Sequence, residues 1–366
     1  MSATLRLAKW LGPWSASSAT PRDISICEEV ADGLESKISV KIYRPEGGRI
    51  RGTYLVSQGL HFLGPDDPRM NRFCSVLANA GFEVIAPRLP SYMAMRLKAS
   101  VIDEFKCVFT QLDRLSVLKT RPALFSISFG ALPVLRLAAD PDVRERVSAV
   151  ITFGGYIDWI AALYYTIEGQ VETANGVFER EPDPLNQPAI FMNFLEGMDL
   201  SETDASILHD AWFAYLRRTW GRDECRAREV HEPIAEEVAL PLTSELRRLF
   251  MLGCGLGDQD EALKICLEAD KRAPELGAAL NVASHLEGIS VPVHLFHGLD
   301  DDVFPHTQME MLKAAFPSHS DVQTYLTGLY GHTGSQMGQL GGIVREMRTM
   351  LRMLHVLANA PESSRG

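Results

Sequence analysis

A serine at position 128 stands between an apolar run and a segment with a helical pattern. Residues 123–125 form the apolar run and predict a buried strand, and residues 131–137 predict a helix. On such a sharp strand-to-helix turn, the serine hydroxyl is lifted clear of the sheet and lies beside free N–H groups at the helix start. Ser128 is therefore a candidate nucleophile for attack on a carbonyl carbon.

Small residues are needed two positions before and two positions after such a nucleophile, because neighbouring backbone crowds those Cα atoms. Gly130 meets this need, and Ser126 stands where glycine is usual. Serine adds only a CH2OH group to glycine, so the turn remains sterically possible. A buried serine before a helix would give the same pattern, so the assignment of Ser128 depends on partners elsewhere in the chain.

An acid and a histidine follow Ser128 in chain order, each just after a predicted strand. Residues 291–297 form a strand-like run that leads to three consecutive aspartates at 300–302. Residues 321–326 alternate like a strand and lead to His332. A carboxylate in such a place can orient an imidazole, and the imidazole can take the proton of the serine. The order Ser, Asp, His predicts a catalytic triad.

This arrangement resembles the α/β-hydrolase family, whose triad has the same chain order. The resemblance covers residues 24–157 and about 291–358, and leaves the middle of the chain unmatched. The family's acid turn, His-Gly-x-x-Asp-x-x-x-Pro, and the Gly-His that carries its base are matched by His297, Gly298, Asp301 and Pro305, and by Gly331 and His332. The resemblance thus implies Asp301 as the orienting acid and His332 as the general base.

Two further points of the candidate site follow from this resemblance. The family forms an oxyanion hole from backbone N–H groups, which implies Phe129 and Leu60 as donors. Gln58 replaces the histidine that is common in the loop after the third strand, but the donor is a backbone group, so Leu60 can still supply it. Asp158, just after the strand predicted over residues 147–153, is an alternative for the acid, since some hydrolases place it there.

Length and pattern predict a core with an added domain. A chain of 366 residues exceeds the roughly 250–300 at which a single core stops growing. Strands and helices alternate over residues 24–157 and 291–366, which predicts an α/β core with a mostly parallel, twisted sheet and helices on both faces. Between residues 158 and 290 the strand signal vanishes, so we expect an inserted helical cap there. Residues 1–23 are expected to form an N-terminal arm.

The predicted cap is acidic. Residues 158–290 carry 25 Asp and Glu against 11 Lys and Arg, a net charge of −14, while the whole chain has a net charge of −11. This charge argues against a nucleic-acid partner and predicts that anionic substrates are disfavoured at low salt. We expect substrate contacts from His61, which is close to the oxyanion loop, and from Tyr164 and Tyr165, which are close to the sheet.

Neither a membrane span nor a metal site is expected. No apolar run reaches the roughly 20 residues of a membrane helix, and the first twenty residues lack the apolar centre of a signal peptide. The six cysteines are scattered without a C-x-x-C pair, which predicts free thiols and a cytoplasmic protein. His231-Glu232 begins like a zinc motif, but Ala235 stands where the second histidine is needed. We therefore expect no metal and no cofactor.

These observations predict a serine hydrolase that cleaves a carboxylic ester, or a related acyl compound, through an acyl-enzyme intermediate. An acyltransferase would use the same triad and differ only in the acceptor. A catalytically silent hydrolase fold that serves as a binding or scaffold protein is the other alternative, because Ser126 and Gln58 depart from the common pattern. The sequence identifies neither the small-molecule substrate nor the oligomeric state.

Overall fold

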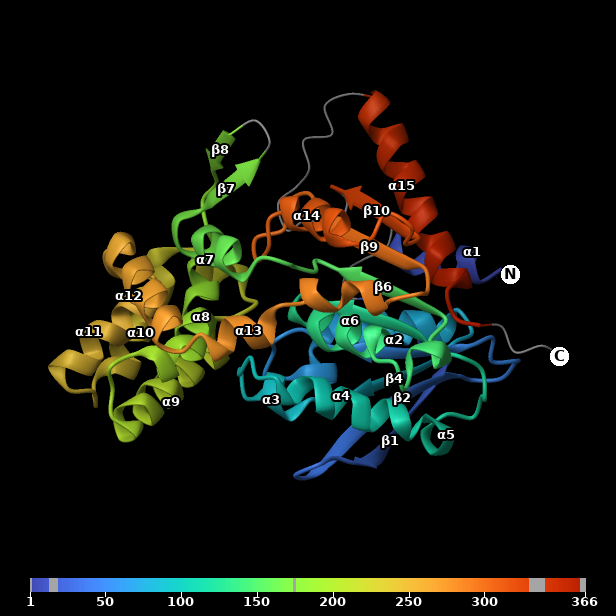
Figure 1. The fold of residues 1–366 in the computed structure, drawn as a ribbon, viewed down its shortest axis with the longest axis horizontal. Coiled ribbons are helices and arrows are strands. Elements are labelled where there is room, and N and C mark those ends of the chain that lie inside the picture. The colour runs from blue at the N-terminus through green and yellow to red at the C-terminus, as the bar shows by residue number, and fades with distance from the viewer. Residues whose placement is uncertain (1, 13–18, 174–175, 329–339, 363–366) are drawn as a thin grey trace.

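A computed structural model describes residues 2–12, 19–173, 176–328 and 340–362 (Figure 1). Its centre is an eight-stranded sheet of order β1-β2-β4-β3-β5-β6-β9-β10. The strands are β1 (Ile24–Asp32), β2 (Lys37–Pro45), β3 (Thr53–Ser57), β4 (Glu83–Pro87), β5 (Ala123–Ile127), β6 (Ala149–Phe153), β9 (Val293–Gly298) and β10 (Val322–Thr327). β2 is antiparallel to both of its neighbours, and the other neighbouring strands are parallel. The chain has an α/β-hydrolase fold, which confirms the predicted fold class.

Both faces of the sheet are covered by helices. The helices of the core are α1 (Ala3–Leu11), α2 (Pro68–Asn79), α3 (Pro90–Met93), α4 (Ser100–Thr110), α5 (Leu112–Leu115), α6 (Ala131–Ala139), α14 (Thr307–Ala315) and α15 (Leu340–Asn359). α1, α2 and α15 pack on one face, and α4, α5, α6 and α14 on the other. Along β5, Leu124 packs on one face while Ala123 and Phe125 pack on the other, as the alternation of a strand requires. Burial on both faces explains why these strands read as continuous apolar runs.

The expected N-terminal arm contains a helix packed on the core. α1 begins at Ser2, whose side chain accepts a hydrogen bond from the N–H of Leu5. Leu7 is fully buried on the sheet face that α2 and α15 cover. The indole N–H of Trp10 donates to the side chain of Asn79 at 3.2 Å. Residues 3–11 are therefore an integral part of one sheet face.

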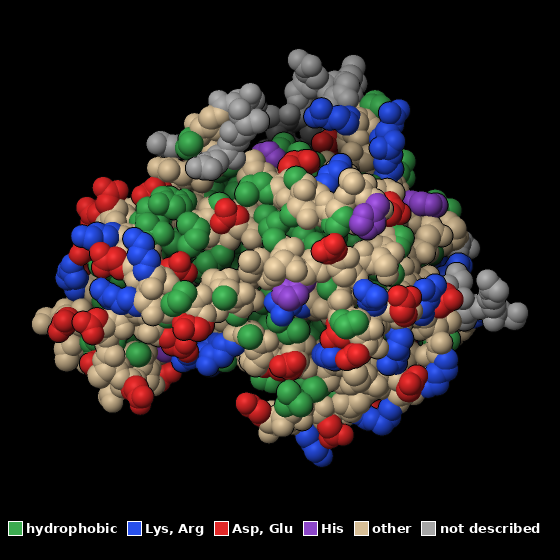
Figure 2. Space-filling view, in the orientation of Figure 1, with side chains coloured by type: hydrophobic (Ala, Val, Ile, Leu, Met, Phe, Trp, Pro, Cys, Tyr) green, Lys and Arg blue, Asp and Glu red, His purple; other side chains and the backbone are tan. Residues whose placement is uncertain are grey.

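Residues 158–290, which we call the insertion, lie to one side of the sheet (Figure 1). Their helices are α7 (Trp159–Glu168), α8 (Gln187–Phe194), α9 (Glu202–Thr219), α10 (Arg228–Ala239), α11 (Ser244–Gly253), α12 (Gln259–Arg272) and α13 (Glu275–Leu280). Their buried side chains are continuous with the hydrophobic core on one sheet face, and among them Trp212 is fully buried and packs on Phe191 and Phe250. Acidic and basic side chains are interspersed over the outside of this part of the molecule (Figure 2).

The expectation that the insertion has no strands is wrong at one place. β7 (Gln170–Thr173) and β8 (Gly176–Glu179) form an antiparallel hairpin after α7. The sequence carries a signal for a hairpin here, because Asn175-Gly176 lies between two short alternating segments. Among the described residues, no helix is long and apolar enough to cross a membrane.

Candidate active site

Ser128 has the backbone of a strained turn between β5 and α6. It opens the short 3-10 turn η2 (Ser128–Gly130), and its φ angle is 53°, in the left-handed region that residues other than glycine rarely adopt. Gly130 has no room for a side chain, because an added Cβ would lie 2.5 Å from the carbonyl oxygen of Gln58. Strain of this kind persists only where the surrounding structure holds it, and it concentrates at functional sites.

The replacement of the usual glycine by Ser126 is accommodated by small neighbours. Ser126 is fully buried on β5, and the strand register places it between Ser57 of β3 and Thr152 of β6. Its hydroxyl has no hydrogen-bond partner among the described residues. The turn therefore forms with serine at this position, as its small volume suggests.

The loop after β3 touches the serine turn. An added Cβ on Gly59 would lie 3.2 Å from Cβ of Ser128, so this loop and the turn are in close contact. The N–H of Leu60 donates to no other described backbone group. Phe129 stands at the start of the turn into α6, where backbone N–H groups lack intrahelical partners. The role of these two N–H groups as oxyanion donors stays a prediction.

Asp301 points toward the interior from the turn after β9. Its Oδ1 accepts hydrogen bonds from the N–H groups of Val303 at 2.9 Å and Phe304 at 2.8 Å. Its Oδ2 lies 3.5 Å from Nε2 of His297 and would lie 2.8 Å from a Cβ added to Gly154, at the end of β6. Burial raises the pKa of Asp301, and the imidazole of His297 and the two N–H groups oppose that rise.

The neighbouring acids have other partners. Oδ1 of Asp300 lies 3.4 Å from the guanidinium of Arg180, and Asp302 contacts the guanidinium of Arg226. Asp158 caps α7, since its Oδ1 accepts a hydrogen bond from the N–H of Ala161 at 2.9 Å. These contacts favour Asp301 over Asp158 as the candidate acid. His332 and Gly331 lie outside the described residues, so the role of His332 stays a prediction.

Ser128 opens into a cavity of about 330 Å³ between the sheet and the insertion. The sequence did not single out the residues of the insertion that line this cavity. They are Asp183, Leu185, Asn186, Trp220, Gly221, Arg222, Asp223 and Arg226. No local pattern identifies them, because their place depends on how the insertion packs on the sheet. Arg69 and Met70, from α2, also line the cavity.

His61 lines this cavity, and its contact with a substrate stays a prediction. Its ring stacks on Phe62, with 4.8 Å between ring centroids, and lies 5.7 Å from Trp220. Nδ1 accepts a hydrogen bond from the N–H of Leu63 at 3.1 Å, and Nε2 lies 3.4 Å from Asp67. Burial lowers the pKa of His61, against the opposing effect of Asp67. These contacts fix the ring of His61 in the wall of the cavity.

Tyr164 and Tyr165 are not among the described residues that line this cavity. Tyr165 is buried, and its hydroxyl donates to the carbonyl oxygen of Asp301 at 2.6 Å. Tyr164 packs against the hydrophobic core. Tyr165 therefore contacts the backbone that carries the candidate acid, a role that helical spacing could not reveal.

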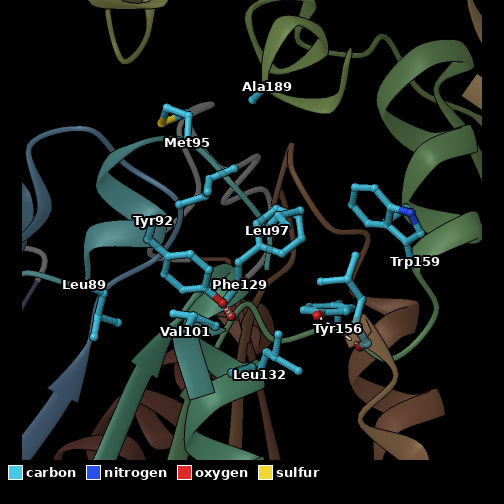
Figure 3. Close-up of a cluster of buried hydrophobic side chains, with 14 of the residues drawn as sticks. Leu89, Tyr92, Met95, Leu97, Val101, Phe129, Leu132, Tyr156, Trp159 and Ala189 are labelled. Atoms are coloured by element: carbon cyan, nitrogen blue, oxygen red, sulfur yellow. Dashed lines mark hydrogen bonds between the residues drawn. The ribbon is translucent and has the colours of Figure 1, made fainter. Parts of the chain in front are cut away.

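An aromatic cluster joins the parts of the site (Figure 3). The ring of Phe129, next to Ser128, packs on Tyr156, Trp159 and Phe304, with centroid distances of 5.3, 5.8 and 4.9 Å. Tyr92 of α3 donates its hydroxyl hydrogen to the carbonyl oxygen of Phe129 at 2.7 Å. The serine turn, the start of the insertion and the turn after Asp301 thus share one packing centre.

Among the described residues, no group of three or more His, Cys, Asp or Glu side chains could hold a metal ion. The groups that could do chemistry in this arrangement are the hydroxyl of Ser128, the half-buried carboxylate of Asp301 and backbone N–H donors.

No family model and no curated protein matches the sequence. Solved structures with a similar fold include the acylaminoacyl peptidase of Pyrococcus horikoshii, at 12% identity and a TM-score of 0.48 over 94% of this chain and 43% of the peptidase. Brefeldin A esterase, described as a bacterial homologue of human hormone sensitive lipase, is 12% identical over 98% of this chain and 85% of the esterase, with a TM-score of 0.49. An esterase of Pyrococcus furiosus is 11% identical over 90% of this chain and 91% of that protein, with a TM-score of 0.46. This chain therefore spans less than half of the length of the peptidase.

Proposed function

We propose that the protein is a serine hydrolase that cleaves a carboxylic ester, or a related acyl compound, through an acyl-enzyme intermediate. The observation that carries the proposal is the left-handed backbone of Ser128 on a strand-to-helix turn that opens into a cavity. The contacts of Asp301 and its place after β9 support the same reaction, because a half-buried carboxylate there can orient an imidazole.

In this mechanism the hydroxyl oxygen of Ser128 attacks the acyl carbon while His332 takes its proton. His332 then returns the proton to the leaving alcohol, and Asp301 holds the imidazole in the tautomer that this requires. The N–H groups of Leu60 and Phe129 stabilise the negative oxygen of the tetrahedral intermediate, and one such donor contributes about 3 kcal/mol to lowering the barrier. Water, activated by His332, then releases the acid and frees Ser128.

The insertion acts as a cap over the site in this proposal, since its residues supply one wall of the cavity. A cavity of about 330 Å³ is at the small end of the range for ligand sites, so a compact acyl group fits better than a long chain. Leu60, Met70, Phe153 and Leu185 give the wall apolar surface for such a group. We propose a small neutral ester or acyl compound as the substrate class.

The test is covalent labelling by a fluorophosphonate probe together with hydrolysis of a series of chromogenic esters. Ser128→Ala is expected to abolish labelling and to lower kcat by at least about 10⁴-fold, because the nucleophile is lost. Ser25→Ala, which removes an exposed serine on β1, is the matched control and keeps both activities.

Labelling of the Ser128→Ala protein would contradict the assignment of the nucleophile. A wild-type protein that neither reacts with the probe nor hydrolyses any ester would favour the silent binding protein. Faster turnover on addition of an alcohol or amine acceptor, with the acyl group found on that acceptor, would identify an acyltransferase.

A further inference from the structure

The turn that follows β9, residues 300–305, is held by contacts with the insertion, and we call it the acid turn. The guanidinium of Arg226 contacts the carboxylate of Asp302 in the acid turn and lies 3.0 Å from Oδ2 of Asp183 in the insertion. Asn186, also in the insertion, donates its side-chain N–H to the carbonyl oxygen of Asp302 at 3.1 Å. Arg226 thus joins one carboxylate of the insertion to one carboxylate of the acid turn.

Two further contacts hold the other aspartates of the acid turn. The hydroxyl of Tyr165 donates to the carbonyl oxygen of Asp301 at 2.6 Å. Arg180, at the end of the hairpin in the insertion, lies 3.4 Å from Oδ1 of Asp300. Three consecutive residues of the acid turn are therefore each bound by a side chain of the insertion.

Of the side chains of the insertion that contact the acid turn, Arg226 is the one whose loss would most change the electrostatic energy, because it is shared by two carboxylates. The side chains of Asp183 and Asp302 are only 8% and 19% exposed, and that of Arg226 is 33% exposed, so water screens this group less than it screens a surface ion pair. Asp223, which lies 3.8 Å from Arg226, is largely exposed. Without the cation they share, Asp183 and Asp302 would be two partly buried like charges that repel each other.

We propose that Arg226 is a positioning residue that fixes the acid turn, and with it Asp301, by neutralising Asp183 and Asp302 together. The positioning role rests on the proposed function in one respect, the role of Asp301 as the acid that orients His332. It adds that the triad is assembled only when the insertion packs on the acid turn. The insertion then contributes to catalysis through the placement of Asp301 as well as through the wall of the cavity.

Hydrogen exchange measures this positioning without any substrate. The N–H groups of Val303 and Phe304 donate to Asp301, so their exchange reports the geometry of the acid turn. In Arg226→Gln we expect exchange of peptides that cover residues 299–306 to become about tenfold faster. With an ester substrate, kcat is expected to fall about tenfold while KM changes less than about threefold, because the placement of a catalytic group is affected and substrate binding is not.

Second-site variants separate positioning from other roles. Arg226→Lys keeps the cation, and Arg226→Gln combined with Asp183→Asn removes the repulsion, so both are expected to restore slow exchange and most of kcat. The matched control is Arg228→Gln, which breaks an exposed pair with Glu232 on α10 and should change neither exchange nor kinetics.

Because Arg226 also lines the cavity, it could instead bind substrate directly. A raised KM with unchanged exchange in Arg226→Gln, or no recovery in the double variant, would overturn the positioning role. Should the wild-type protein show no labelling and no hydrolysis, the proposed function fails, whereas the exchange experiment still decides whether Arg226 fixes the acid turn.

Discussion

The three aspartates at positions 300–302 differ in what they contact, although the sequence places them side by side. Asp300 and Asp302 lie near arginines of the insertion, and Asp301 accepts two backbone hydrogen bonds and faces Gly154. A turn that follows a strand directs successive side chains to different sides, so the carboxylate of Asp301 faces the end of β6 while those of Asp300 and Asp302 face the insertion. This difference can be tested by Asp→Asn substitutions, which replace one carboxylate oxygen by an NH2 group and keep the size of the side chain.

Asp301→Asn keeps the size of the side chain but favours the wrong tautomer of the imidazole, a change that costs about 10⁴ in kcat in a serine protease. We expect a loss of at least about 10²-fold in kcat here, with the fold intact. Asp158→Asn is the matched control, because asparagine caps a helix as well as aspartate does, and it should stay within about threefold of wild type. Steady-state kinetics of both variants on one ester decide which aspartate is the acid. A large loss of kcat in Asp158→Asn, with Asp301→Asn still active, would identify Asp158, after β6, as the acid.

At the scale of elements, the site depends on how β5, α3, the acid turn and the start of the insertion meet around Phe129. Its carbonyl oxygen is bound by Tyr92, and its ring contacts Phe304, three residues after Asp301. Packing of aromatic rings at these distances is directional, so it fixes the angle between the elements as well as burying their surface. The nucleophile and the acid are therefore placed relative to each other through one shared side chain.

A cluster of charged side chains joins β1, the end of β4 and the segment just before α2. Arg88, just after β4, lies 2.9 Å from Oε1 of Glu28 on β1 and 2.8 Å from Oδ2 of Asp66. A hydrogen bond from Arg88 lowers the pKa of Glu28. Burial tends to raise the pKa of Asp66, but hydrogen bonds from Lys41 and Arg88 outweigh it, so the pKa of Asp66 is also lowered.

Carboxyls with a lowered pKa bind fewer protons in the folded than in the unfolded state, so they stabilise the fold above their unfolded pKa of about 4 and lose that contribution as the pH falls through the folded pKa. Arg88→Gln is therefore expected to lower the free energy of unfolding by about 1 kcal/mol at pH 7 and by less at pH 3, where part of the contribution is lost. Denaturant unfolding at the two pH values measures this. Lys119→Gln, which alters an exposed pair with Asp113, is the control. An equal loss at both pH values would show that Arg88 acts through packing and not through charge.

The elements that the sequence predicts well are those that local patterns determine. The strands around Ser128 are apolar because both sheet faces are buried. A small residue is required at position 130 because the backbone of Ser57 and Gln58 lies close to it. The resemblance of residues 297–305 to the acid turn of the α/β-hydrolase family singled out Asp301 among three aspartates. The assignment of Asp301 as the acid stays a prediction.

What the sequence does not predict depends on contacts between distant segments. Arg226 lies in the cavity wall because the insertion packs on the acid turn, 76 residues away along the chain. For the same reason, the hydroxyl of Tyr165 donates to a backbone carbonyl oxygen, and Tyr165 is not among the described residues that line the cavity. The burial of Leu7 depends on α15, at the other end of the chain. Only the hairpin at residues 170–179 had a local signal that the helical pattern around it concealed.

At the scale of the molecule, the net charge of −14 on the insertion meets a core that is close to neutral. The cavity between them contains three arginines, but two of them are already paired. Arg69 lies 3.2 Å from Asp67, and Arg226 is shared by Asp183 and Asp302. Arg222 is exposed, and Asp223, the residue that follows it, also lines the cavity. We therefore expect that the local cations do not reverse the negative field of the insertion.

A negative field over the cavity should slow the approach of anionic substrates and leave neutral ones unaffected. For a matched pair of esters that differ by one remote carboxylate, we expect the neutral ester to have the higher kcat/KM at low salt. The ratio should shrink by about threefold or more between 0.02 and 0.5 M salt, because the screening length falls from tens of ångströms to a few. The neutral ester alone at both salt concentrations is the control for effects of salt on the fold. A preference for the anionic ester at low salt would mean that Arg222 binds its carboxylate directly, and Arg222→Gln would then remove that preference.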